Sequence, residues 1–166
     1  MGTILCLHGP PGCRITDLFS LFEKEDYFAF THSYKSFTGQ ELLDTKIERN
    51  NYRLTNEFLL LSILATQELN VAISFPTFFK STKRLWGERE KAKLVVIYLT
   101  ADFPYLLAHD THREYLKILE NGYFTAPIPE YSQTYGDEKR LYHDYKINIT
   151  NKTLTTLASE IYDLLP

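Results

Sequence analysis

The chain has 166 residues, of which 44% are hydrophobic and 14% aromatic, and its net charge is −3. These values are typical of one globular domain, and this charge gives no general attraction to nucleic acid or to acidic membranes. No apolar run reaches the roughly 18 residues of a membrane span, and no signal-peptide pattern opens the chain. We therefore expect a single domain at residues 1–166, without a membrane partner, in the cytoplasm, where the two cysteines stay reduced.

The first half of the chain alternates short apolar runs with stretches of helical periodicity. Between Leu54 and Leu69, leucine, alanine and phenylalanine recur at a spacing close to that of one helix face. In chain order we predict a strand at Thr3–Leu7, a helix at Thr16–Glu23, a strand at Tyr27–Thr31, a short helix that Thr38 caps, a helix at Leu54–Leu69, a strand at Val71–Phe75 and a charged helix at Ser81–Lys91.

The second half continues the same alternation. Leu94–Leu99 is the most apolar strand candidate, and such a run suits a central parallel strand that is covered on both faces. We further predict a helix at Phe103–Glu120, bent around residues 109–112, a strand at Tyr145–Ile149 and a final helix at Leu154–Leu165. Five alternations of strand and helix predict an α/β fold, a three-layer α/β/α sandwich with a five-stranded, mainly parallel sheet.

The segment between the first strand and the first helix reads GPPGCRIT. The phosphate-binding pattern G-x-x-x-x-G-K-[ST] occupies this position, and its backbone N–H groups surround the phosphates. Gly9 matches the first glycine and Thr16 the hydroxyl that binds a metal ion, whereas Arg14 and Ile15 replace the second glycine and the lysine. Arg14 could supply the missing charge if its guanidinium folds inward.

Two interpretations of this segment stay open. The segment is either a modified nucleotide- or phosphate-binding loop, or a tight strand-to-helix turn that has lost its ligand. In the first case the binding residues are Gly9, Pro10, Pro11, Gly12, Cys13, Arg14, Ile15 and Thr16.

Other residues that could carry chemistry each have a structural interpretation beside the functional one. Cys13 lies near the expected helix N-terminus, where a thiolate is favoured, but no base is placed to support a reactive thiol, which favours a small loop residue. His109 and His112, with Asp110 between them, are spaced for a metal site, or they lie on a helix surface. Tyrosines between residues 123 and 145 could stack on a base, or they pack over the core.

The order of these segments resembles the P-loop small-molecule and polynucleotide kinases, most closely the group of the phage polynucleotide 5′-kinase and its AAA-type kinase-like relatives. The resemblance runs from Ile4 to about Tyr145, and the family's G-x-P-G-x-G-K-[ST] loop aligns with Gly9–Thr16 without a gap. It implies that this loop binds ATP or GTP with Mg²⁺ and that Thr16 is the metal ligand. It also implies a lid-like segment at about 103–142, in which Arg113 is the arginine that clamps the phosphate.

Three positions depart from the family's pattern. The loop lysine is Ile15, the acidic base after the second strand is replaced by His32 or Ser33, and the acid at the end of the third strand is Ser74. His32 could act as the base, because a neutral imidazole near pH 7 can accept a proton. The basic pair that follows the third strand in the family is present as Lys83-Arg84.

The resemblance implies a kinase-like domain whose partner is a nucleotide or a phosphorylated small molecule. If active, the chain is an ATP-dependent phosphotransferase whose acceptor is a hydroxyl of a nucleoside, a nucleic-acid end or a small molecule. The three departures favour the alternative of a catalytically impaired pseudokinase that acts as a protein-interaction module. The sequence leaves open which of the two it is.

Overall fold

The computed structural model of the chain describes residues 2–22, 27–30, 63–75, 78, 80, 83–84, 93–111, 113, 115–116 and 141–166. Several sequence predictions lie outside these residues: the short helix that Thr38 caps, the candidate bases His32 and Ser33, and His112 of the candidate metal pair. Most of the predicted lid-like segment also lies outside them.

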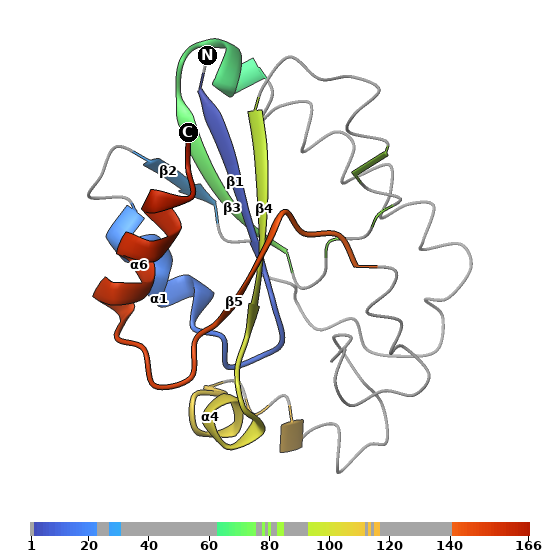
Figure 1. Ribbon diagram of the computed structural model, residues 1–166, viewed down its shortest axis with the longest axis vertical. Helices are drawn as coiled ribbons and strands as arrows, with labels where there is room; N and C mark the ends of the chain where they lie inside the picture. Colours follow the sequence, from blue (N-terminus) through green and yellow to red (C-terminus); the bar gives the residue numbers. More distant parts are fainter. Residues whose placement is uncertain are drawn as a thin grey trace.

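The described core is a sheet of five parallel strands (Figure 1). The strands are β1 (Thr3–His8), β2 (Tyr27–Phe30), β3 (Asn70–Phe75), β4 (Lys93–Thr100) and β5 (Tyr145–Asn148), in the order β2-β3-β1-β4-β5. Each of the five predicted strands is present within one residue of its predicted bounds at either end. The prediction of an α/β fold with a parallel sheet is confirmed.

Three helices are described around this sheet: α1 (Ile15–Phe22), α4 (Phe103–Ala108) and α6 (Leu154–Asp163). Helices α1 and α6 lie side by side on one face of the sheet, and α4 lies at its lower end (Figure 1). The rings of Phe22 and Tyr162 meet edge-on between α1 and α6, with centroids 5.2 Å apart. None of the described helices has the length and apolar character needed to cross a membrane.

Side chains of the strands alternate between two buried clusters, as the two-residue repeat of a β-strand requires. On the α1 and α6 face, Leu5 and Leu7 of β1 pack with β4 residues and with helix residues such as Leu18. On the opposite face, Ile4 and Cys6 pack with Ala65, Phe78 and their neighbours. Both faces of the sheet are therefore covered, and residues 94–100 are buried along their whole length, as predicted for a central strand.

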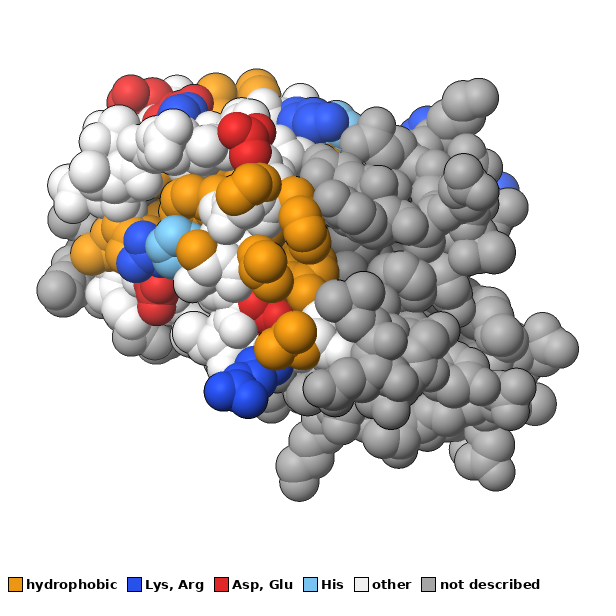
Figure 2. All heavy atoms as spheres, turned by 90° about the horizontal axis from the view of Figure 1, so that it is seen from below, with side chains coloured by type: hydrophobic (Ala, Val, Ile, Leu, Met, Phe, Trp, Pro, Cys, Tyr) orange, Lys and Arg blue, Asp and Glu red, His pale blue; other side chains and the backbone are white. Residues whose placement is uncertain are grey.

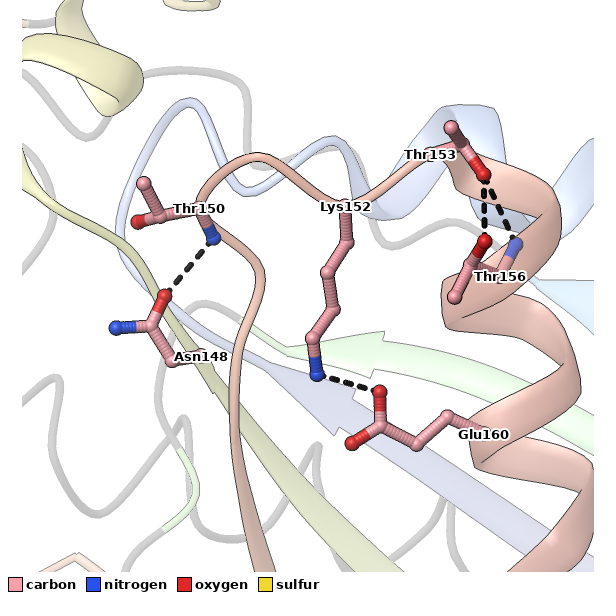
Figure 3. A network of polar contacts seen from close by, with 6 residues as sticks. All are labelled: Asn148, Thr150, Lys152, Thr153, Thr156 and Glu160. Atoms are coloured by element: carbon pink, nitrogen blue, oxygen red, sulfur yellow. Dashed lines mark hydrogen bonds and ion pairs between the residues drawn. The ribbon is translucent and has the colours of Figure 1, made fainter.

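A polar connection joins β5 to α6 and fixes the start of that helix (Figure 3). Asn148 Oδ1 accepts a hydrogen bond from the amide of Thr150 at 2.8 Å. The Thr153 hydroxyl caps α6 by accepting from the amide of Thr156 at 3.1 Å, which satisfies one donor of the first turn. Thr150 Oγ1 in turn accepts from the amide of Asp102 at 2.8 Å, so the connection is tied to the residue that precedes α4.

Helix α4 is shorter than the predicted helix at Phe103–Glu120. It ends at Ala108, and His109 is its C-cap, so the predicted interruption lies at its expected place. The Asp110 carboxylate accepts a hydrogen bond from the amide of Tyr115 at 2.8 Å, which competes with the regular backbone ladder. Residues 115–116 are helical again.

Candidate functional site

The loop of residues 9–14 connects the middle strand to α1 in a tight turn. Cys13 N donates to Pro10 O at 3.3 Å, and the first backbone hydrogen bond of α1 runs from Leu18 N to Arg14 O at 3.2 Å. The amides at the start of α1 have no carbonyl within the helix to bond to, and they carry the positive end of its dipole. Pro10 and Pro11 lack an N–H group and the Cys13 N–H is used within the turn, which leaves the amides of Gly12 and of residues 14–16 as candidate donors at the start of α1.

Both glycines of the loop make close backbone contacts. A Cβ atom on Gly12, whose φ is +87°, would lie 2.2 Å from the carbonyl oxygen of Leu106 in α4. A Cβ atom on Gly9 would lie 2.6 Å from the carbonyl oxygen of Leu99 in β4. Packing against β4 and α4 is therefore sufficient to explain why glycine stands at both positions, with or without a ligand.

Arg14 has the left-handed backbone conformation at the position where the phosphate-loop pattern has glycine. Its φ is +59°, although a residue with a side chain is disfavoured there by about 1–2 kcal/mol. The guanidinium Nε donates to Asp17 Oδ2 at 2.9 Å. The bond to Asp17 is the main cause that raises the pKa of Arg14, with a contribution from Tyr105. A cation thus lies at the start of α1.

The other predicted loop residues separate into packing and exposed groups. Ile15 is partly buried and packs against the core cluster on the α1 face, so it cannot replace the loop lysine. Cys13 is 2% exposed and its thiol contacts Leu99 O at 3.4 Å, which favours a packing role over redox chemistry. Thr16, the predicted metal ligand, is the second residue of α1 and is exposed. Ser74 of β3 pairs with Leu7 of β1, beside the strand end that precedes the loop.

The segment after α4 is brought to the loop by a hydrogen bond. Tyr115, which is buried, donates its hydroxyl to Pro11 O at 2.8 Å, and its ring packs edge-on against Phe103. Arg113, the predicted lid arginine, is exposed two residues before Tyr115 and has a φ of +54°. The structure therefore places the segment that carries Arg113 against the candidate loop, while His32 lies outside the described residues.

Of the predicted metal group, the structure describes His109 and Asp110, whereas His112 lies outside the described residues. His109 Nδ1 lies 2.8 Å from Tyr105 O, and its ring packs on that of Tyr105 at a centroid distance of 4.2 Å. The Asp110 carboxylate is used by the amide of Tyr115. Among the described residues, no three histidine, cysteine or acidic side chains come together as a metal site.

His8 is a polar core residue that the sequence predictions missed. It is fully buried at the end of β1, directly before the loop, with Nε2 3.0 Å from Tyr142 O, while Nδ1 accepts from the amide of Phe78 at 3.3 Å. Burial lowers its pKa to about 3, against the opposing effect of the hydrogen bond to Tyr142. The ring is therefore neutral, with Nε2–H donating. Its position two residues after Cys6, on the same strand face, was the available signal.

We expect His8→Gln to weaken the dependence of stability on acid pH. Because the folded-state pKa of His8 is about 3, only the unfolded chain binds this proton between pH 3 and about 6.5, and stability falls as pH falls. Between pH 7.5 and pH 5, binding of this proton to the unfolded chain lowers the free energy of unfolding of the wild type by about 2 kcal/mol. The variant lacks the imidazole and does not lose this stability. Urea unfolding of both proteins at several pH values measures the difference, and parallel pH curves would contradict the buried neutral ring.

The end of the molecule that carries α4 exposes apolar side chains. Figure 2, which views the molecule from that end, shows hydrophobic side chains gathered between charged groups. Leu107 of α4 is 46% exposed and Leu116 is 43% exposed. These side chains lie on the segments that contact the loop, because Leu106 meets Gly12 and Tyr115 bonds to Pro11.

Comparisons with known proteins identify the fold. No family model matches the sequence, and no curated protein matches it. Among solved structures, the Mycobacterium tuberculosis APS kinase CysC in complex with AMPPNP and APS is 12% identical, with a TM-score of 0.68 over 98% of this chain and 96% of that chain. A sugar kinase from Janibacter sp. HTCC2649 is 12% identical, with a TM-score of 0.65 over 98% of this chain and 94% of that chain.

A third similar structure is that of APE1195, which is 18% identical, with a TM-score of 0.65 over 98% of this chain and 94% of that chain. Likeness at these identities concerns the fold. The chain has the fold of the P-loop kinases, in agreement with the fold that the order of its segments predicts.

Proposed function

We propose that the chain is a P-loop kinase-like domain that binds a nucleotide, ATP or GTP, with Mg²⁺ at the Gly9–Thr16 loop. The observation that carries this proposal is Arg14, which has the left-handed conformation at the pattern's glycine position and presents a guanidinium at the N-terminus of α1. A helix N-terminus and an arginine are two groups that bind phosphate well. The donor set of the loop therefore fits a phosphate even though Ile15 replaces the lysine.

Each predicted residue has a role in this proposal. The amides of Gly12 and of residues 14–16 surround the phosphates, the Arg14 guanidinium takes the part of the lysine, and the Thr16 hydroxyl is the metal ligand. Arg113 approaches the transferred phosphate from the segment that Tyr115 holds against the loop. Mg²⁺, when bound, neutralises charge on the outer phosphates. His32 is proposed as the group that accepts the proton of the acceptor hydroxyl.

The proposed reaction moves the terminal phosphate of ATP to a hydroxyl group. The acceptor is a small molecule, a nucleoside or a nucleic-acid end, and the small molecule is supported by the fold that this chain shares with an APS kinase and a sugar kinase. The proposal places the protein in the cytoplasm, where the buried thiols of Cys6 and Cys13 stay reduced.

A specific observation also favours the second candidate, a catalytically impaired module that binds another protein. Ile15 packs into the core, and Ser74 occupies the strand position of the family's acidic residue. The exposed Leu107 and Leu116 beside the loop would then belong to the protein-binding surface.

Nucleotide binding measured by thermal shift and calorimetry tests the proposal. We expect Mg·ATP or Mg·GTP at 100 times its dissociation constant to stabilise the fold by about 2.7 kcal/mol, which raises the melting temperature by roughly 5–10 °C. Chelating Mg²⁺ should reduce this shift, because the metal ion offsets the charge of the phosphates. Absence of saturable binding by any nucleoside di- or triphosphate would contradict the proposal. Binding without phosphate transfer to any hydroxyl acceptor would support the second candidate.

A further inference from the structure

The guanidinium that we assign to phosphate binding already has an anion of this chain beside it. Asp17, three residues after Arg14 in the first turn of α1, accepts its Nε–H at 2.9 Å. The Asp17 side chain is 51% exposed and that of Arg14 is 28% exposed, so the ion pair is in contact with solvent.

The Asp17 carboxylate is attracted by the same two groups that would attract a phosphate. It meets the guanidinium of Arg14, and it lies within the first helical turn, where the dipole of α1 favours a negative charge. A pair this exposed is weak, because solvent screens the attraction and two flexible side chains lose freedom when they pair. A ligand with several anionic oxygens can therefore displace it, since guanidinium–phosphate contacts are charge-assisted and often bidentate.

We propose that Asp17 is an internal competitor for the phosphate ligand, which must displace its carboxylate from Arg14 in order to bind. This inference rests on the proposed function of the loop. The competition lowers the affinity of every anion that binds the Arg14 guanidinium by the same factor, because each of them must first break the ion pair with Asp17.

The experiment is a double-mutant cycle between Arg14 and Asp17. Binding of Mg·ATP and of inorganic tripolyphosphate is measured by calorimetry for the wild type, Asp17→Asn, Arg14→Ala and the double variant. We expect Asp17→Asn to bind both probes about two- to fivefold more tightly than the wild type, which is the range of an exposed ion pair. We expect no gain from the same change in the Arg14→Ala background, because Asp17 acts through Arg14. High salt should shrink the gain.

Asp102→Asn is the matched control for the general loss of a negative charge. Asp102 is exposed, precedes α4 at the same end of the sheet, and makes no side-chain cap bond to that helix. A gain as large in this control, or a gain that persists without Arg14, would show a general charge effect and overturn the inference. Unchanged or weaker binding by Asp17→Asn would overturn it and leave the proposed function standing. If neither probe binds to any of the four proteins, both the inference and the proposed function fail.

Discussion

Replacing Gly12 with alanine is expected to destabilise the fold by about 3 kcal/mol. The new methyl group would lie 2.2 Å from the carbonyl oxygen of Leu106, so α4 or the loop must move, and overpacking of this kind costs about 1–3 kcal/mol. The φ of +87° adds about 1–2 kcal/mol for any residue with a Cβ atom. Urea unfolding followed by circular dichroism measures the loss as a lower midpoint.

The control for Gly12→Ala is Ser20→Ala in α1. Ser20 is exposed on the helix that follows the loop, so its change to alanine should alter the free energy of unfolding by less than about 0.5 kcal/mol. A Gly12→Ala protein as stable as this control would contradict the close packing of α4 on the loop. Nucleotide affinity should fall in Gly12→Ala as well, because the loop cannot keep its shape once α4 is displaced.

Replacing Arg14 with alanine is expected to lower the affinity for Mg·ATP about 10- to 100-fold, with little change in stability. A hydrogen bond from a charged group to a bound anion contributes about 1.5–3 kcal/mol, and each 1.4 kcal/mol corresponds to a factor of ten. The free energy of unfolding should change by less than about 1 kcal/mol, because the ion pair with Asp17 is exposed. Calorimetric titration and urea unfolding of the same samples separate the two effects.

Two further substitutions and one control distinguish the charge of Arg14 from its backbone conformation. Arg14→Gly relieves the strain of the φ of +59° while removing the cation, so it should bind as weakly as Arg14→Ala without loss of stability. Arg14→Lys keeps the charge but not the planar fork, so its affinity should lie between the two. Lys93→Ala removes an exposed cation at the start of β4, far along the strand from the loop, and should bind like the wild type. Wild-type affinity in Arg14→Ala would contradict the role of the guanidinium.

The strands could be predicted from the sequence because their cause is local. Runs such as Leu94–Leu99 consist of aliphatic and β-branched residues, which both suit an extended backbone and require burial. The interruption after α4 was predicted at residues 109–112, but the hydrogen bond of the Asp110 carboxylate with the amide of Tyr115 was not predicted. Such a bond between a side chain and the backbone interrupts a helix only when the folded chain brings the two groups together, which the sequence alone does not show. The order of the strands depends on long-range pairing and was not predicted.

The candidate site was predictable as a set of residues and not as an arrangement. The pattern GPPGCRIT identified the loop. The close approach of Leu106 in α4, which leaves no room for a side chain at Gly12, is a contact between residues 94 positions apart in the chain. The ion pair between Arg14 and Asp17 was not within reach of the sequence, because Arg14 precedes α1 in a left-handed conformation and helical spacing does not apply to it. The burial of His8 was indicated by its place on the strand face of Cys6, but its hydrogen bonds with Phe78 and Tyr142 depend on segments that are distant in the sequence.

The parallel sheet has a consequence for how the chain folds during synthesis. Neighbouring parallel strands cannot be joined by a short hairpin. β1 therefore pairs only after β3 and β4 have been synthesised, and their residues are translated much later. The loop after β1 takes its final shape later still, because Gly9 packs against Leu99 and Gly12 packs against Leu106. At synthesis rates of about 5–20 residues per second, the segment near the N-terminus that was made first acquires its shape only seconds later. A ribosome-bound chain that stops before Leu106 therefore contains the complete sequence of the Gly9–Thr16 loop without the contacts that give the loop its shape.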